Sequence, residues 1–214
     1  MEENQEVKRI KVITEGLSGM CHKAERMLDL TIDGFVHHSK NKIEQAEKLG
    51  EDIHGEEKRL TALLVHSSPG GVEDKEQLKA LVASVTHLQG VGEALKGMFP
   101  HVRNKVNENV LFSDKAVGEL KFLFENTREV LKNAGDFFLT RNPLLMNYVL
   151  EKGVYLNEIA DSYAIEHEDR LISGVCMPKA SPLYINILES VARINWHTMR
   201  AIDRFCSPKG DMEK

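Results

Sequence analysis

Residues 167–204 read HEDRLISGVCMPKASPLYINILESVARINWHTMRAIDR. Gly174 and Pro178 interrupt the helical pattern, and Ser181-Pro182 restarts it, because serine caps free backbone N–H groups and proline fits the first helical position. From about Pro182, apolar residues recur at the spacing of one helix face: Tyr184, Ile187, Leu188, Val191, Ile194, Thr198, Ala201 and Phe205. The opposite face carries Asn186, Glu189, Arg193, Arg200 and Arg204. We therefore expect a long amphipathic helix that packs on a bundle.

The composition favours a helical protein. The chain has 214 residues, of which 29% are charged and 6% aromatic, and only 6 are proline. No alternation of polar and apolar residues, as in β-strands, persists anywhere. The mixed charges sum to −5, without the basic patch of a nucleic-acid-binding protein. We therefore do not expect nucleic-acid binding. No nucleophile motif or Walker-type lysine occurs, so we do not expect catalysis either.

The N-terminus and the cysteines indicate a cytoplasmic protein. Residues 1–14, MEENQEVKRIKVIT, lack the order of a signal peptide, in which basic residues precede an apolar run. No apolar run reaches the roughly 18 residues of a membrane span. The cysteines are scattered and odd in number, which fits free thiols better than disulfides or a metal knuckle: Cys21, Cys176 and Cys206.

The two halves of the chain share a hydrophobic pattern at a constant offset of 103 residues. The matching pairs are Leu17 and Leu120, Leu28 and Leu131, Phe35 and Phe138, Ile43 and Met146, Ile53 and Leu156, Leu81 and Tyr184, Val85 and Leu188, Leu88 and Val191, and Val91 and Ile194. This pattern predicts an all-α fold of two tandem three-helix repeats, residues 1–110 and 111–214, in a six-helix bundle. One shared core and two separate bundles both remain open.

Caps and breakers give the expected helix boundaries. Pro100 should end or kink the third helix, because proline lacks a backbone N–H. Residues 67–71, SSPGG, predict a loop. The expected helices cover residues 6–38, 41–66, 73–99, 113 onward, 142–173 and 182 onward.

Two segments carry a family resemblance. Residues 167–176 contain H-x-x-R-L-x-x-G-x-C, and residues 191–197 read VARINWH. They resemble the H-x-x-R-L-x-x-G and L-E-R-I-G-D-H segments of the PhoU family of phosphate-uptake regulators, which includes the PhoU-like domains of bacterial sodium/phosphate cotransporters. That family has two three-helix repeats of about this length, so the resemblance covers essentially the whole chain. It implies the same fold and a role in regulating phosphate uptake.

The resemblance also implies acidic metal ligands on the second and third helices of each repeat. In the second repeat these positions hold Gly153, Asn157, Ala192 and Trp196, which leaves no anionic ligand. We interpret the glycine and the alanine as space for the indole.

The first repeat keeps more of the implied site, with His54, Gln89 and Glu93. Together with water they would hold one divalent metal ion. In the alternative, His54 and Glu93 hydrogen-bond across the helix seam without a metal. We interpret three other histidines structurally: His37 and His38 as capping residues at a helix C-terminus, and His167 as an orienting or surface residue.

These observations predict a non-catalytic helical adaptor that regulates phosphate transport or phosphate-responsive signalling. Its partner would be a phosphate transporter component or a sensor kinase, and it would reach the membrane only through that partner. Arg193, Trp196 and Arg200 are the expected contact residues, and we expect a homodimer. Two alternatives remain: a metal-binding protein that uses the site in the first repeat, and a structural homodimer with its interface near Trp196.

Overall fold

The chain forms a bundle of long helices in the computed structural model, which describes residues 2–66 and 72–206. No strand occurs among these residues, so the all-α prediction is confirmed. The predicted loop at residues 67–71 lies outside the described residues. The helices are α1 (Glu2–His37), α2 (Lys40–Val65), α3 (Val72–Asn107), α4 (Asp114–Thr140), α5 (Pro143–Ile172) and α6 (Ser181–Cys206).

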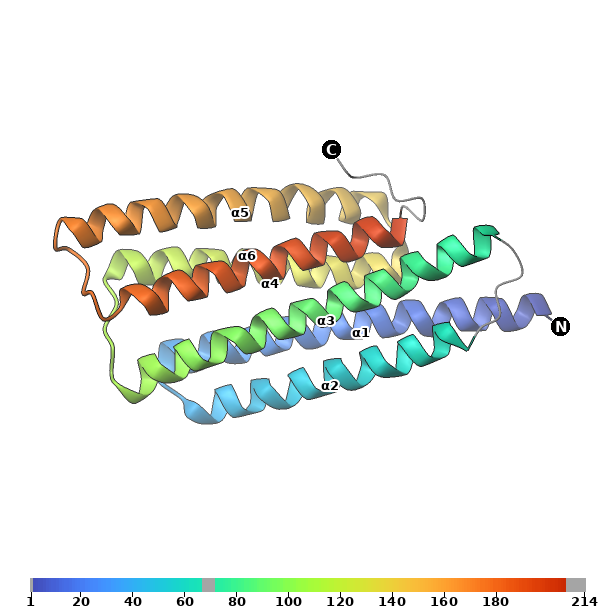
Figure 1. The fold of residues 1–214 in the computed structure, drawn as a ribbon, viewed down its shortest axis with the longest axis horizontal. Coiled ribbons are helices and arrows are strands. Elements are labelled where there is room, and N and C mark those ends of the chain that lie inside the picture. Colours follow the sequence, from blue (N-terminus) through green and yellow to red (C-terminus); the bar gives the residue numbers. More distant parts are fainter. Residues whose placement is uncertain (1, 67–71, 207–214) are drawn as a thin grey trace.

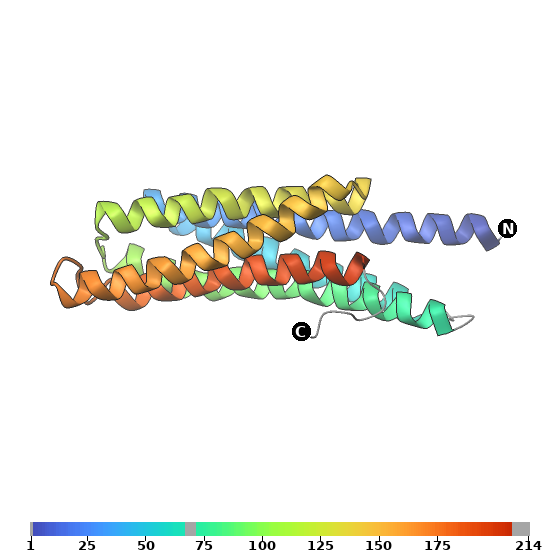
Figure 2. The same cartoon turned by 90° about the horizontal axis from the view of Figure 1, so that it is seen from above.

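The six helices lie side by side along the long axis of the molecule (Figures 1 and 2). Helix α1 packs against α4, and α3 packs against α6, so the two halves of the chain meet through corresponding helices. Helices α2 and α5 lie at opposite edges, and each contacts only the other two helices of its own half. All six helices contribute to one continuous hydrophobic core. The molecule is therefore one bundle with a shared core.

The hydrophobic pattern at the 103-residue offset describes this core well. Most members of the matching pairs are buried, including Leu17 and Leu120, and Phe35 and Phe138. Leu81 is half-buried where its counterpart is the fully buried Tyr184. Burying a large apolar side chain stabilises a fold by roughly 1.5–3 kcal/mol, so the buried members of this pattern together make a large contribution to the core.

Local signals fix several helix ends. The Ser113 hydroxyl accepts a hydrogen bond from the Ala116 amide, and the Asn142 side chain accepts one from the Leu144 amide. Pro143 then occupies the first turn of α5. Arg141 ends α4 in the left-handed conformation, with φ of 53°. These starts of α4 and α5 agree with the sequence-based expectation.

The predicted end of the third helix at Pro100 was wrong, and the alternative of a kink there stays a prediction. Helix α3 continues through Pro100 to Asn107, because its last two turns bury Val102 and Val106 in the core. The Nζ of Lys105, which is only 6% exposed, donates to the Phe35 carbonyl over 3.0 Å. Tertiary packing at Pro100 therefore outweighs the local preference. Helix α6 begins at Ser181, within one residue of the expected start at about Pro182.

Candidate functional site

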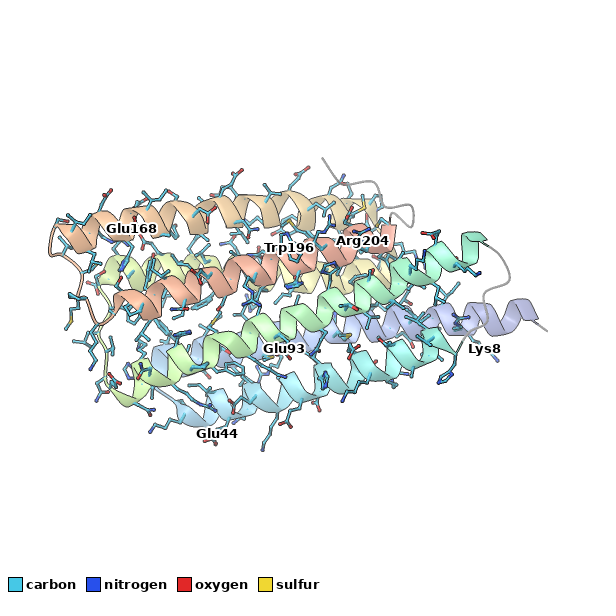
Figure 3. The ribbon with its side chains drawn as sticks, viewed as in Figure 1. Lys8, Glu44, Glu93, Glu168, Trp196 and Arg204 are labelled. Carbon is cyan, nitrogen blue, oxygen red and sulfur yellow. The ribbon has the colours of Figure 1, made fainter. Side chains whose placement is uncertain are left out.

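The three predicted metal ligands lie close together where α2 packs against α3. The side-chain nitrogen of Gln89 lies 3.2 Å from Nδ1 of His54 and donates to Oε1 of Glu93 over 3.0 Å. Nζ of Lys96 donates to the same oxygen over 3.0 Å. Gln89 thus bridges His54 and Glu93, and a lysine engages the carboxylate. Glu93 is exposed, and Figure 3 labels it on α3.

This donor set does not suit a hard divalent cation. Such ions prefer several oxygen ligands, whereas the single carboxylate here already pairs with Lys96 and the Gln89 nitrogen faces the other two side chains. Within residues 2–66 and 72–206, no group of three or more His, Cys, Asp or Glu side chains could hold a metal ion. Hydrogen bonding among polar side chains accounts for the contacts, and the metal role stays a prediction.

At the corresponding positions of the second repeat, the structure differs from our interpretation that Gly153 makes space for the indole. A Cβ atom on Gly153 would come within 2.6 Å of the Met199 side chain, so Gly153 makes space for Met199 and not for the indole. Trp196 instead lies 46% exposed on α6 (Figure 3). Asn157 is half-buried, and its Oδ1 has no hydrogen-bond partner.

The predicted contact residues occupy the exposed side of α6. Arg193 is exposed, and Trp196 presents almost half of its surface to solvent. Arg200 is half-buried and its guanidinium donates to Asp203 over 3.2 Å. Arg193 and Trp196 are therefore available to a partner, whereas Arg200 is already engaged within the helix.

Trp196 also belongs to an aromatic cluster across the seam of α3 and α6. Its ring centroid lies 5.5 Å from that of His87 and 4.8 Å from that of His197. The Nδ1 atoms of the two histidines are 3.2 Å apart. Burial lowers the pKa of His87 to about 4, and the neighbouring His197 and Arg200 act in the same direction.

We compared the chain with known proteins. No protein-family model matches the sequence, and no curated protein matches it. Among solved structures, PhoU from Pseudomonas aeruginosa matches with a TM-score of 0.80 at 12% identity, over 94% of this chain and 97% of that one. The chain has a PhoU-like fold. The phosphate transport system regulatory protein PhoU from Streptococcus pneumoniae matches with a TM-score of 0.77 at 13% identity, over 94% of both chains.

The segment that resembles the PhoU H-x-x-R-L motif forms a buried polar network. The Arg170 guanidinium donates to both carboxylate oxygens of Glu119, over 3.0 and 2.8 Å, and the Tyr184 hydroxyl donates to one of them. The His167 ring stacks on Tyr184, and its Nε2 lies 2.9 Å from the Ser181 hydroxyl. These contacts tie α4, α5 and α6 together at one end of the bundle.

This network corrects the interpretation of His167. The residue is 2% exposed, so it is no surface residue, and burial lowers the pKa of its imidazole. Ser181, which we expected to cap α6, uses its hydroxyl to contact this ring. Burial and the Glu119 carboxylate raise the pKa of the Tyr184 hydroxyl, which therefore remains a donor at neutral pH.

Sequence reasoning missed Glu119 and the His87–His197 pair. Glu119 lies on the buried face of α4, and an ordinary amphipathic pattern gives no reason to place a carboxylate there. His87 and His197 are 110 residues apart, which does not match the repeat offset of 103. The one available signal in the sequence was Gly90, a glycine inside a helical pattern. In the structure a Cβ atom there would lie 2.4 Å from the His197 ring.

Proposed function

We propose that this chain regulates phosphate transport or phosphate-responsive signalling as a non-catalytic cytoplasmic adaptor. The observation that supports the proposal is the match of nearly the whole chain to two PhoU structures, one of which is described as a phosphate transport system regulatory protein. None of the described helices is long and apolar enough to cross a membrane. In this proposal the chain reaches the membrane only by binding a phosphate transporter component or a sensor kinase.

The contact surface in this proposal centres on Trp196 and Arg193. An aromatic ring that is 46% exposed beside an exposed arginine has the residue types that dominate binding energy at protein interfaces. Arg200 flanks them and contributes positive charge, although its guanidinium is paired with Asp203. An acidic or amphipathic surface on the partner would match this side of α6.

The test is capture of partners from phosphate-replete and phosphate-starved cells of the native host after mild crosslinking. We expect the tagged protein to recover a phosphate transporter subunit or a sensor kinase in a phosphate-dependent manner. Trp196→Ala combined with Arg193→Glu should abolish that recovery, whereas Lys132→Glu, an exposed charge reversal on α4, should not. Failure to recover a transporter subunit or a sensor kinase, in phosphate-replete and in phosphate-starved cells alike, would refute the regulatory role.

Self-association is a separate part of the proposal. If the surface around Trp196 joins two copies, its fluorescence emission should shift to longer wavelength as the protein is diluted, because the ring then becomes more exposed. Sedimentation at the same concentrations should show the matching change from dimer to monomer. An emission maximum and a sedimentation coefficient that stay constant on dilution would exclude this interface for a reversible homodimer.

Metal binding at His54, Gln89 and Glu93 also remains a proposal, supported by the proximity of the three side chains. Metal analysis of the purified protein beside Glu93→Ala tests it. A lower metal content in the variant than in the wild-type protein would support the site. An equal, near-zero metal content in both proteins would exclude it.

A further inference from the structure

His87 of α3 and His197 of α6 face each other across the seam between the two halves of the chain. Their Nδ1 atoms lie 3.2 Å apart, and their ring planes are inclined by 51° with centroids 5.5 Å apart. A hydrogen bond between the rings requires one Nδ1 to carry the proton and the other to accept it. The same spacing also suits a second arrangement, in which both nitrogens bind one ion.

The spacing matches that of two imidazole ligands on one metal ion. Zinc–nitrogen bonds are about 2.0–2.1 Å long, so two nitrogens at tetrahedral or square-planar angles lie roughly 2.9–3.4 Å apart. The two nitrogens therefore already lie at a chelating separation, and the rings must turn so that both lone pairs point at one ion.

The surroundings hold both rings in place. Gly90 lies directly beneath His197, where any Cβ atom would collide with the ring at 2.4 Å. The Trp196 indole packs edge-on against both imidazoles. Because the indole is 46% exposed and both histidines are half-buried, the cluster lies close to solvent and an ion can reach it. Ligands that are positioned before the ion arrives lose less conformational entropy on binding.

We propose that His87 and His197 bind one divalent transition-metal ion of the imidazole-preferring class, Zn²⁺, Ni²⁺ or Cu²⁺, with water in the remaining positions. No group of three or more His, Cys, Asp or Glu in the described part of the chain could hold a metal ion, so the pair supplies the only two protein ligands. Ca²⁺ and Mg²⁺ should not bind to this pair, because they require oxygen donors.

The charges around the pair limit its affinity for a cation. Arg200 and Arg204 act on His87 and Arg193 acts on His197, so three arginines repel a dication, while the Asp203 carboxylate near His87 offsets them in part. We therefore expect reversible binding.

An ion at this position would connect the third helices of the two repeats. Binding to the folded state alone stabilises a protein in proportion to the logarithm of ion concentration over Kd. The pair is distinct from the His54, Gln89 and Glu93 set, which lies at the seam of α2 and α3. The inference does not depend on the proposed role in phosphate regulation.

The experiment uses the full-length, metal-free protein with its affinity tag removed, because a histidine tag binds the same ions. Trp196 is the only tryptophan in the chain, and its ring touches both ligands, so Ni²⁺ or Cu²⁺ should quench its fluorescence in a saturable titration that fits a single site. Zn²⁺ should raise Tm and compete with the quenching ions. Ca²⁺ and Mg²⁺ should do neither.

Two variants and two controls assign the site. His87→Asn and His197→Asn should each weaken binding at least tenfold, while far-UV circular dichroism without metal confirms that they fold. His66→Asn and His101→Asn, neither of which belongs to a proposed metal site, should leave the titration unchanged. Binding that is equal in wild type and in both seam variants, binding that is lost in His66→Asn, or no binding by wild type at millimolar metal would each overturn the proposal.

Discussion

Glu119 is a buried carboxylate whose partners come from two other helices. It is 6% exposed, accepts two hydrogen bonds from Arg170 and one from Tyr184, and lies on the face of α4 that packs into the core. Removing one member of a buried ion pair leaves the other charged and without compensation, which costs more than the pair itself contributes. Other packings of these helices would separate the charges, so the network disfavours such packings.

We predict that Glu119→Ala lowers the free energy of unfolding by about 3 kcal/mol, since it removes both hydrogen bonds from the largely buried Arg170 guanidinium to a carboxylate and leaves it only the longer ion pair with Glu166 at 3.6 Å. Urea denaturation followed by circular dichroism measures the change. Glu158→Ala removes an exposed carboxylate on α5 and should change stability by no more than about 0.5 kcal/mol. Equal losses in the two variants would contradict a special role for Glu119.

His167 makes stability depend on pH. Burial and the Arg170 cation lower the pKa of its imidazole from the ordinary value of 6.5, while Glu119 and Glu168 oppose them. The unfolded chain thus takes up the proton more readily than the folded one, so stability is lost as pH falls from about 6.5 toward the folded-state pKa. We predict a lower free energy of unfolding at pH 5 than at pH 7.5, and a smaller difference in His167→Asn.

The matched control for this prediction is His66→Asn, because His66 is exposed at the end of α2. It should keep the full pH dependence of the wild type. A His167→Asn variant whose denaturation midpoints at the two pH values differ as much as those of wild type would show that other groups carry the effect.

At the scale of the element, two of the three glycines of α3 are under opposite constraints. Gly97 has no neighbouring atom within 4 Å of the place where a Cβ would stand, whereas a Cβ on Gly90 would meet the His197 ring at 2.4 Å. Glycine inside a helix costs stability through backbone entropy. One of these glycines is therefore replaceable and the other is required by the contact of α3 with α6.

We predict that Gly97→Ala raises the free energy of unfolding by about 0.5–1 kcal/mol, because alanine is the better helix former. Gly90→Ala should lower it by roughly 1–3 kcal/mol, since the added methyl group displaces the His197 ring from a packed seam. Thermal denaturation of the two variants in parallel provides the measurement. A stabilising Gly90→Ala would show that the seam is looser than the contacts indicate.

Most helix boundaries could be predicted because their signals are local. Ser113 and the Asn142-Pro143 pair act through hydrogen bonds to the next few residues, so the sequence alone is sufficient there. Pro100 misled the prediction because its effect depends on whether the residues beyond it are buried. The partner of Ser181 lies on another helix, which a single-helix pattern cannot show.

At the scale of the whole molecule, the contacts between helices follow the internal repeat of the sequence. Each contact among α1, α2 and α3 has its counterpart among α4, α5 and α6, and the halves join through α1 with α4 and α3 with α6. The offset of 103 residues predicted this fold because the core follows it. The His87–His197 pair joins positions that are not equivalent in the two repeats, so a search for internal repetition could not find it.

We predict that residues 1–110 and 111–214 do not fold independently, because each alone would expose the apolar faces of two helices to water. Each fragment should give a broad, non-cooperative thermal transition by circular dichroism, and an equimolar mixture should recover a single sharp one. A cooperative transition for either fragment alone would mean that one repeat forms a sufficient core.

The placement of the outer helix ends has a further consequence. Helix α1 begins and α6 ends at the same end of the bundle, whereas α3 and α4 are joined at the opposite end (Figure 1). The last helix thus ends at the end of the bundle where the first helix begins. A circularly permuted gene that begins at α4 and joins the end of α6 to the start of α1 would exchange the order of the repeats while preserving every helix contact. Such a rearrangement leaves no trace in the architecture, so the two halves of a distant relative could be read in either order.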